Sequence, residues 1–295
     1  MSDICVVHLV RKKNGLEPFR LFLASYLEHP AGVDHDLLIL YKGFNRETDI
    51  APYEQLLQDV PHSFLKVAEF GFDLRPYFIA AEKYNSRYFC YLNSFSVILD
   101  KDWLFKLYRH INQPGVGLVG ATGSWGSICP KHLRAKENMP LWEKLLRPLA
   151  WRVLRAYRGM YFDDFPNYHI RTNGFMITRE TMIKIQRGLI LTKMHAYRLE
   201  SGKNSITRQV EQMGLKCMVV DKNGIGYDKQ EWNISNTFWR GMQENLLISD
   251  NQTRKYDADD SGWRCKWQQF AWGEMADESQ DNMRIADENS AFCSQ

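Results

Sequence analysis

The sequence predicts an α/β fold with a mostly parallel sheet and helices on both of its faces. Short apolar runs rich in β-branched residues recur through the first 110 residues, and helix-length amphipathic segments separate them. Polar loops, several of them containing glycine, follow the apolar runs. This alternation is typical of parallel sheets that are buried on both sides. Such sheets bind ligands at the carboxyl ends of their strands, so the loops after the strands should hold the functional groups.

The first half of the chain contains five apolar runs that we expect to be strands. A helix opened by Pro18 follows the first run, and Asp100 is the expected N-cap of the last helix. The expected strands are 4–10, 35–41, 63–68, 87–92 and 97–99. The expected helices are 17–29, 53–60, 76–84 and 101–111.

The second half continues the pattern with a strand at 116–119 and a strand or strand pair at 169–177. Thr178 is expected to cap a helix at 179–187, and Asn204 a helix at 205–213, before a strand at 216–220. Beyond Trp232 the periodicity is weak. We therefore expect one domain over 1–230 and an irregular C-terminal extension over 231–295, mobile in its last fifteen residues.

The composition is that of a globular protein, with 44% hydrophobic and 25% charged residues. A net charge of +3 is too small to indicate nucleic acid as a partner. The six cysteines are scattered without a Cys-x-x-Cys pair, which argues against a disulfide or zinc framework. The sequence has no run of 18 apolar residues and no signal-peptide pattern, so we expect a cytoplasmic protein.

A short polar motif follows the strand predicted at 87–92. The ordered series of strand, Gly71-x-Asp73 loop, helix, strand and this motif resembles glycosyltransferases with the GT-A fold, family 2 type, over roughly residues 3–230. The resemblance implies that the strand should end in Asp-x-Asp, whose carboxylates hold Mg²⁺ or Mn²⁺ against the donor diphosphate. Asn93-Ser94-Phe95 stands there instead. An amide offsets no charge and Phe cannot ligate a cation, so we expect no metal site of that type.

Cationic side chains are then needed to stabilise the leaving diphosphate. Arg171 and Arg75 rank first, because both lie in loops at predicted strand ends and a guanidinium grips phosphate with paired hydrogen bonds. Solvated surface charge is the alternative for each. Asp163-Asp164 is an alternative metal site, although adjacent side chains diverge. Further cationic candidates are Lys12, Lys13, Lys203, Arg208 and Arg240.

The resemblance also implies roles for the remaining site residues. Asp73 would contact the nucleotide base and ribose, with a helix N-cap as the alternative. Asn93, Ser94 and Asn173 would lie beside the donor, although Asn173-Gly174 also fits a plain tight turn. Glu200 would be the base that deprotonates the acceptor hydroxyl, with a structural salt bridge as the alternative. Arg208 would orient Glu200 or contact phosphate.

Residues 131–160 form a basic insertion. Between 131 and 158 there are eight Lys or Arg residues and two acids, and the apolar and basic residues fall on opposite sides of a helical wheel, with a bend expected at Pro148. We expect the apolar face to pack on the catalytic domain. The alternative is an interfacial helix on an anionic membrane, as a peripheral protein on its inner face.

These features together predict a glycosyltransferase that uses a nucleotide-diphosphate sugar. The expected acceptor is a glycan or a lipid-linked glycan, the transfer is expected to be inverting, and metal is expected to be dispensable. Two alternatives stay open: a non-catalytic glycan-binding domain of GT-A-like fold, and a nucleotidyltransferase of related topology.

Overall fold

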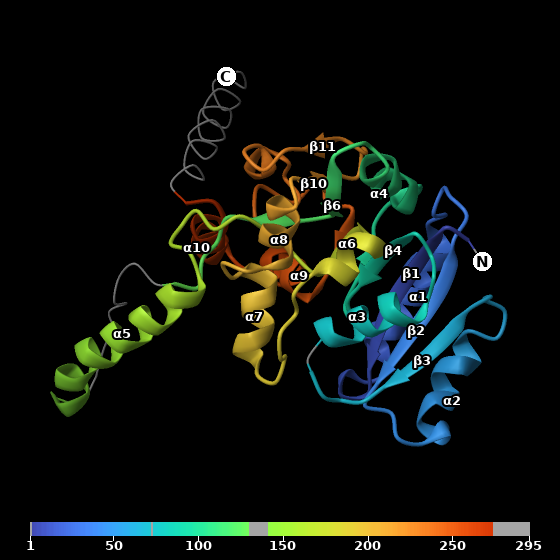
Figure 1. Cartoon of the computed structure of the whole chain (residues 1–295), viewed down its shortest axis with the longest axis horizontal. Coiled ribbons are helices and arrows are strands. Elements are labelled where there is room, and N and C mark those ends of the chain that lie inside the picture. Colours follow the sequence, from blue (N-terminus) through green and yellow to red (C-terminus); the bar gives the residue numbers. More distant parts are fainter. Residues whose placement is uncertain (1, 72, 130–140, 274–295) are drawn as a thin grey trace, which may run out of the picture.

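The structure is a computed structural model that describes residues 2–71, 73–129 and 141–273. Its centre is an eight-stranded sheet in the order β11-β10-β6-β9-β4-β1-β2-β3, which runs through the middle of Figure 1. The strands are β1 (Ile4–Arg11), β2 (Asp36–Lys42), β3 (Ser63–Val67), β4 (Tyr88–Leu92), β6 (Val116–Gly120), β9 (Gly174–Thr178), β10 (Lys216–Val220) and β11 (Gly226–Tyr227).

The sheet is mostly parallel, which confirms the predicted fold class. β1 pairs in parallel with β2 and β4, β2 with β3, and β6 with β10. β9 lies between β4 and β6 and runs antiparallel to both, and β11 is an antiparallel edge strand. Because β9 runs the other way, its first residues lie beside the carboxyl ends of β4 and β6.

Helices cover both faces of the sheet, and each face has its own apolar core. Alternate residues of β1 point to opposite sides, Cys5, Val7 and Leu9 into one core and Ile4 and Val6 into the other. The first core is covered by α3 (Leu74–Lys83), α6 (Arg179–Lys184), α7 (Lys193–Ser201) and α8 (Ile206–Gln212). The second is covered by α1 (Glu17–Glu28), α2 (Glu47–Leu56) and α4 (Trp103–Ile111).

Several predicted helix starts are wrong because the N-cap lies elsewhere. Asp100 does not cap α4: its carboxylate accepts a hydrogen bond from Lys106 Nζ at 2.6 Å, and Asp102 holds the N-cap position. Ser205 instead of Asn204 caps α8, while the Thr178 cap of α6 is confirmed. The helix expected at 53–60 begins earlier, at Glu47, and α7 was not predicted.

The chain after residue 231 is more regular than its weak periodicity predicted. It contains η2 (Trp232–Ile234), β12 (Ile248–Ser249), α9 (Asn251–Ala258) and α10 (Ser261–Trp272). β12 pairs with β5 (Val97–Ile98), and Trp232 and Trp272 are buried in the first core. A few large aromatic side chains therefore anchor this segment. The expected mobility of the last fifteen residues lies outside the described residues.

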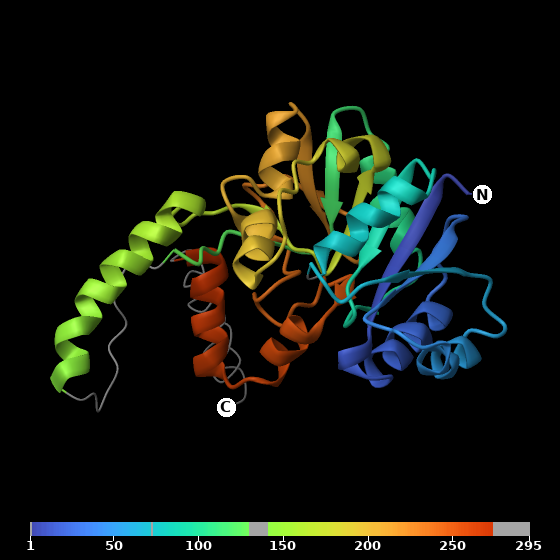
Figure 2. The same ribbon diagram turned by 60° about the horizontal axis from the view of Figure 1, so that its bottom comes forward.

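The basic insertion forms α5 (Leu141–Tyr161), a 21-residue helix that continues through Pro148. The prediction that its apolar face packs on the catalytic domain is wrong for the described side chains, because Leu149 and Val153 are each 63% exposed. Figures 1 and 2 show α5 projecting away from the sheet and its helices. Residues 131–140 lie outside the described residues. No helix in the described ranges has the length and hydropathy needed to cross a membrane.

Candidate functional site

Polar groups gather where β4 and β6 end and β9 begins. Leu92, the last residue of β4, lies opposite Gly174, and Gly120, the last residue of β6, lies opposite Phe175. Gly174 packs closely there, because a Cβ atom would lie 2.9 Å from Cδ1 of the Ile248 side chain. This register brings the segments that follow β4 and β6 against the segment that precedes β9. The edge is the one at which open α/β sheets bind their ligands.

The predicted Asn-Ser-Phe motif folds into a hydrogen-bonded turn at this edge. Asn93 Oδ1 accepts hydrogen bonds from the Phe95 N–H at 2.8 Å and from Ser96 Oγ at 3.3 Å. Ser96 Oγ also donates to the Asn173 carbonyl at 2.5 Å, which confirms that the motif and the start of β9 lie together. Ser94 Oγ is buried and has no hydrogen-bond partner among the described residues.

The donor atoms at this turn do not fit a divalent cation of the Asp-x-Asp type. Asn93 Oδ1 is occupied by donors of its own turn, and Phe95 contributes its N–H to Asn93 and its carbonyl to Arg254 at 3.2 Å. No group of three His, Cys, Asp or Glu residues within the described ranges is arranged to hold a metal ion. The alternative metal site at Asp163-Asp164 is not supported either, because both carboxylates form ion pairs. Asp163 pairs with Arg208 at 3.2 Å and Asp164 with Arg155 at 3.9 Å.

Arg171 lies beside this edge, within a buried ion pair. Its guanidinium is 2.8 Å from Asp250 Oδ2, donates to Thr122 Oγ1 at 3.3 Å and lies 3.9 Å from the centre of the Phe238 ring. Thr122 Oγ1 in turn donates to Asn173 Oδ1 at 2.5 Å. Arg171 lies in a loop before a strand, as expected, and there it ties the C-terminal segment to the sheet edge.

Asp250 is a residue whose pairing the sequence did not reveal. Its carboxylate accepts from the N–H groups of Gln252 and Thr253 as the N-cap of α9, and Thr253 returns a hydrogen bond to complete a capping box. The second contact of Asp250, with Arg171, joins residues 79 positions apart and depends on the fold.

A second charged group lies at the ends of β1 and β2. Arg11 contacts Glu69, and its Nη1 lies 3.0 Å from Asp73 Oδ1. Lys42 is fully buried, and burial, followed by the charge of Arg11, lowers its pKa to about 8, with Asp73 and Glu69 opposing the shift. Asp73 occupies the N-cap position of α3 without a side-chain cap hydrogen bond, so the simple capping alternative is wrong.

Sequence reasoning overlooked Arg11 and Lys42 as site residues. Each is the last residue of its strand, which was the available signal. The parallel register places them directly opposite each other. Arg11, 10% exposed, can present its charge at the ligand-binding edge, whereas the fully buried Lys42 can act there only through the electrostatic effect of its charge.

Two predicted site arginines lie away from the Asn93 turn. Arg75 packs along Gly71 and lies 5.3 Å from the centre of the Phe70 ring. Arg208 binds Asp163 and also Glu211, at 3.5 Å, rather than Glu200. The structure therefore does not support either of the two roles suggested for Arg208. Other cationic candidates are also committed: Lys12 to Asp49 at 2.7 Å, Lys13 to Glu69 at 4.0 Å and Lys203 to the Gly159 carbonyl at 2.7 Å.

Glu200 lies near the C-terminus of α7, with its carboxylate toward a small pocket. Thr172 Oγ1 lies 3.4 Å from Glu200 Oε1 in hydrogen-bonding geometry. Burial is the main cause that raises the pKa of Glu200 to about 7, and the charge of Asp73 adds to it, while Thr172, Arg171 and Lys193 act in the opposite direction. Apart from Thr172 and Glu200, the pocket lining is apolar: Leu118, Ile170, Phe175 and Ile206.

Tyr77 is fully buried at the end of β4. Burial raises its pKa, and the charges of Asp73 and Glu200 add to the shift. Its hydroxyl donates to the Leu92 carbonyl at 3.2 Å, a contact that sequence reasoning did not anticipate.

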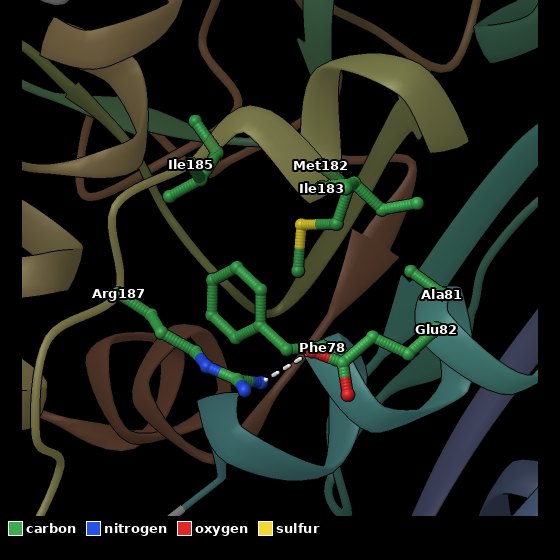
Figure 3. A pocket seen from close by; sticks show the side chains of 7 residues that line it. All are labelled: Phe78, Ala81, Glu82, Met182, Ile183, Ile185 and Arg187. Carbon is green, nitrogen blue, oxygen red and sulfur yellow. Dashed lines mark ion pairs between the residues drawn. The ribbon is translucent and has the colours of Figure 1, made fainter.

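A larger cavity of about 190 Å³ lies between α3 and α6, and contains none of the predicted site residues. Figure 3 shows the Phe78 ring beside Arg187 and Met182. Arg187 pairs with Glu82 at 3.0 Å, so the two charged groups of the lining neutralise each other. This cavity offers little polar chemistry, and the candidate site remains at the carboxyl edge of the sheet.

The chain matches no protein-family model and no curated protein. Similar solved structures include the mannosyltransferase PcManGT from Pyrobaculum calidifontis in complex with GDP-Man and Mn²⁺, at 10% identity and a TM-score of 0.47, covering 88% of this chain and 65% of that one. The chain thus spans slightly under two thirds of that protein.

Two further similar solved structures have lower TM-scores. Mouse xyloside xylosyltransferase 1 in its apo form is 10% identical with a TM-score of 0.39, covering 74% of this chain and 85% of that one. S. aureus TarS is 11% identical with a TM-score of 0.33, covering 48% of this chain and 23% of that one. At such identities and scores, only the residues of this chain bear on its function.

Proposed function

We propose that this protein is an inverting glycosyltransferase that moves a sugar from a nucleotide-diphosphate donor to a hydroxyl group of a glycan or lipid-linked acceptor. The observation that carries the proposal is Glu200. Its carboxylate faces an apolar pocket beside Thr172, one residue from the Asn173 contact with the end of β4. A pKa of about 7 suits a general base at neutral pH, since about half of the groups are then ionised and the group remains basic.

The proposed reaction is a single displacement at the anomeric carbon. The acceptor oxygen attacks that carbon while its proton passes to the Glu200 carboxylate. The bond between the anomeric carbon and the diphosphate oxygen breaks, and the electron pair leaves with the nucleoside diphosphate. Attack from the face opposite the leaving group inverts the configuration.

The donor is proposed to lie along the carboxyl edge, between the Asn93 turn and the ends of β1 and β2. Asp73 accepts hydrogen bonds from the base or ribose, and Ser94 Oγ, buried without a described partner, donates to the donor. Arg11 and Lys42 offset the diphosphate charge in place of a metal. Asn93 and Asn173 shape the turn that supports the donor sugar.

A nucleotide panel tests the proposal directly. UDP, GDP, dTDP and CMP are each added to the protein with Mn²⁺ or with EDTA, and thermal unfolding is followed. One nucleotide should stabilise the fold, by about 2.7 kcal/mol at a concentration 100 times its Kd, equally in both buffers. Stabilisation that strictly requires Mn²⁺ would disprove metal independence.

The matching nucleotide sugars then separate the functions. A transferase should release nucleoside diphosphate slowly from one donor without an acceptor, and faster with one. Glycan binding without any release would identify a non-catalytic binding domain. Release of pyrophosphate from a nucleoside triphosphate and a sugar phosphate would identify a nucleotidyltransferase.

A further inference from the structure

The C-terminal half of α5 exposes apolar side chains on one face, although the Tyr157 hydroxyl also accepts a hydrogen bond from Arg198 of α7 at 2.7 Å. Leu149, Val153, Tyr157 and Met160 recur at spacings of three and four residues, which places them on one side of the helix. Their exposed fractions are 63, 63, 37 and 62%, and the neighbouring Leu154 is 40% exposed. Apolar surface gathered in this way marks an interaction site.

The same helix carries basic residues. Arg152 borders the apolar face, whereas Arg155 and Arg158 lie on the opposite side of the helix. The sequence of α5 holds five Lys or Arg residues against one acid, Glu143. Arg152 is exposed. The other two keep their charges near the helix: Arg155 lies 5.5 Å from the Trp151 ring and 3.9 Å from Asp164, and Arg158 donates to the Ile128 carbonyl at 2.9 Å.

Either a second copy of the protein or a lipid bilayer could cover the apolar face of α5, and the charge of the helix distinguishes the two. Pairing with α5 of a second copy would bring two basic helices together with one acid on each, so like charges would oppose association. A bilayer with anionic headgroups satisfies both features, since acyl chains take up the apolar side chains and phosphates attract the arginines. The helix does not qualify as a membrane span.

We infer that α5 docks this protein on anionic lipid bilayers. The helix lies in the plane of the interface, with Leu149, Val153 and Met160 among the acyl chains and Arg152 at the phosphates. At 21 residues, α5 is about 30 Å long, so all three turns of apolar side chains reach the surface together. The inference does not depend on Glu200 or on the donor.

Sedimentation with vesicles tests the docking. The whole protein is mixed with phosphatidylcholine vesicles that contain or lack 30% phosphatidylglycerol. We expect sedimentation with the anionic vesicles only. Val153→Asp and Leu149→Asp should each weaken it at least tenfold, and Arg152→Gln about fivefold, the value of one cation near an anionic surface. Leu27→Asp on α1, where Leu27 is 61% exposed, is the matched control and should sediment as the wild type.

Two results would overturn the inference. Equal sedimentation of wild type and both aspartate variants would show that α5 is not the contact. A dimer in lipid-free solution that Val153→Asp dissociates, without vesicle binding, would assign the face to a second copy. A cooperative thermal unfolding transition close to that of the wild type shows that each variant is folded. Arg152→Gln tests the inference without altering the apolar face.

Discussion

Asp73 and Glu200 are two carboxylates at the same edge of the sheet in opposite environments. The Asp73 side chain is 42% exposed and lies 3.0 Å from Arg11. Glu200 faces an apolar pocket, and its nearest donor, Thr172 Oγ1, is 3.4 Å away. A paired carboxylate is suited to binding, whereas a desolvated one with a pKa of about 7 is suited to moving protons. Because both residues are carboxylates, only this difference in environment supports a binding role for Asp73 and the role of base for Glu200.

Replacing Glu200 by Gln should have the largest effect if this contrast is correct. The variant loses the group that accepts the proton, so kcat should fall by roughly 10² to 10⁴ while donor binding stays unchanged. Turnover with the identified donor and acceptor, together with the thermal shift by the nucleotide, measures both. Full activity would remove Glu200 as the base.

Stability gives an independent check on the Glu200→Gln variant. Because folding raises the pKa of Glu200, the folded state loses stability as the pH rises through about 7 and the carboxylate ionises within its pocket. Glutamine does not ionise. The variant should therefore unfold at a higher temperature than the wild type at pH 8.5 and at a similar temperature near pH 4.

Breaking the Arg171–Asp250 ion pair tests whether the C-terminal segment stabilises the carboxyl edge of the sheet. Their side chains are 14% and 3% exposed, and removing one charge leaves the other buried. Asp250→Asn should destabilise the fold by about 3 kcal/mol, which denaturant unfolding measures. Glu180→Gln is the control, because Glu180 and Lys184 are largely exposed, and it should leave the stability nearly unchanged. Equal effects would refute a structural role for the buried pair.

Replacing Arg11 tests the role of the Asp73 region in nucleotide binding. Arg11→Met leaves Asp73 and Glu69 without their cation, and should weaken nucleotide binding about tenfold, since a charged hydrogen bond contributes about 1.5 kcal/mol. It should also lower kcat, because the charge of the leaving diphosphate grows in the transition state. Calorimetric titration with the nucleotide gives the affinity. Lys13→Met, 4.0 Å from Glu69 and 58% exposed, should change it less.

The smallest expected effect concerns the electrostatic interaction between Asp73 and Glu200. The charge of Asp73 helps to raise the pKa of Glu200. Asp73→Asn removes that charge, so the pKa of Glu200 should fall and the rise of kcat/KM with pH should occur at lower pH. A profile that does not move, or moves to higher pH, would mean that the two carboxylates do not interact.

Periodicity and turn residues predicted the sheet well. The apolar runs of the first half each became a strand, because burial on both sides of a parallel sheet leaves a continuous apolar signature. Capping residues and periodicity predicted less well where a contact with another residue determined the local structure. Asp100 had the chemistry of a cap but binds Lys106, and α10 formed from a segment whose anchors are isolated aromatic residues such as Trp272.

The sequence alone determined that the loops after the strands form the ligand-binding edge, because strand order along the chain and the carboxyl-end rule depend on local patterning, although it did not reveal Arg11 and Lys42 there. It marked Asp73, Asn93 and Asn173 correctly as neighbours of that edge. Only the tertiary structure decided their partners: Asp250 for Arg171, Arg11 for Asp73 and an apolar pocket for Glu200. These contacts join distant segments, and charge and desolvation act through space rather than along the chain.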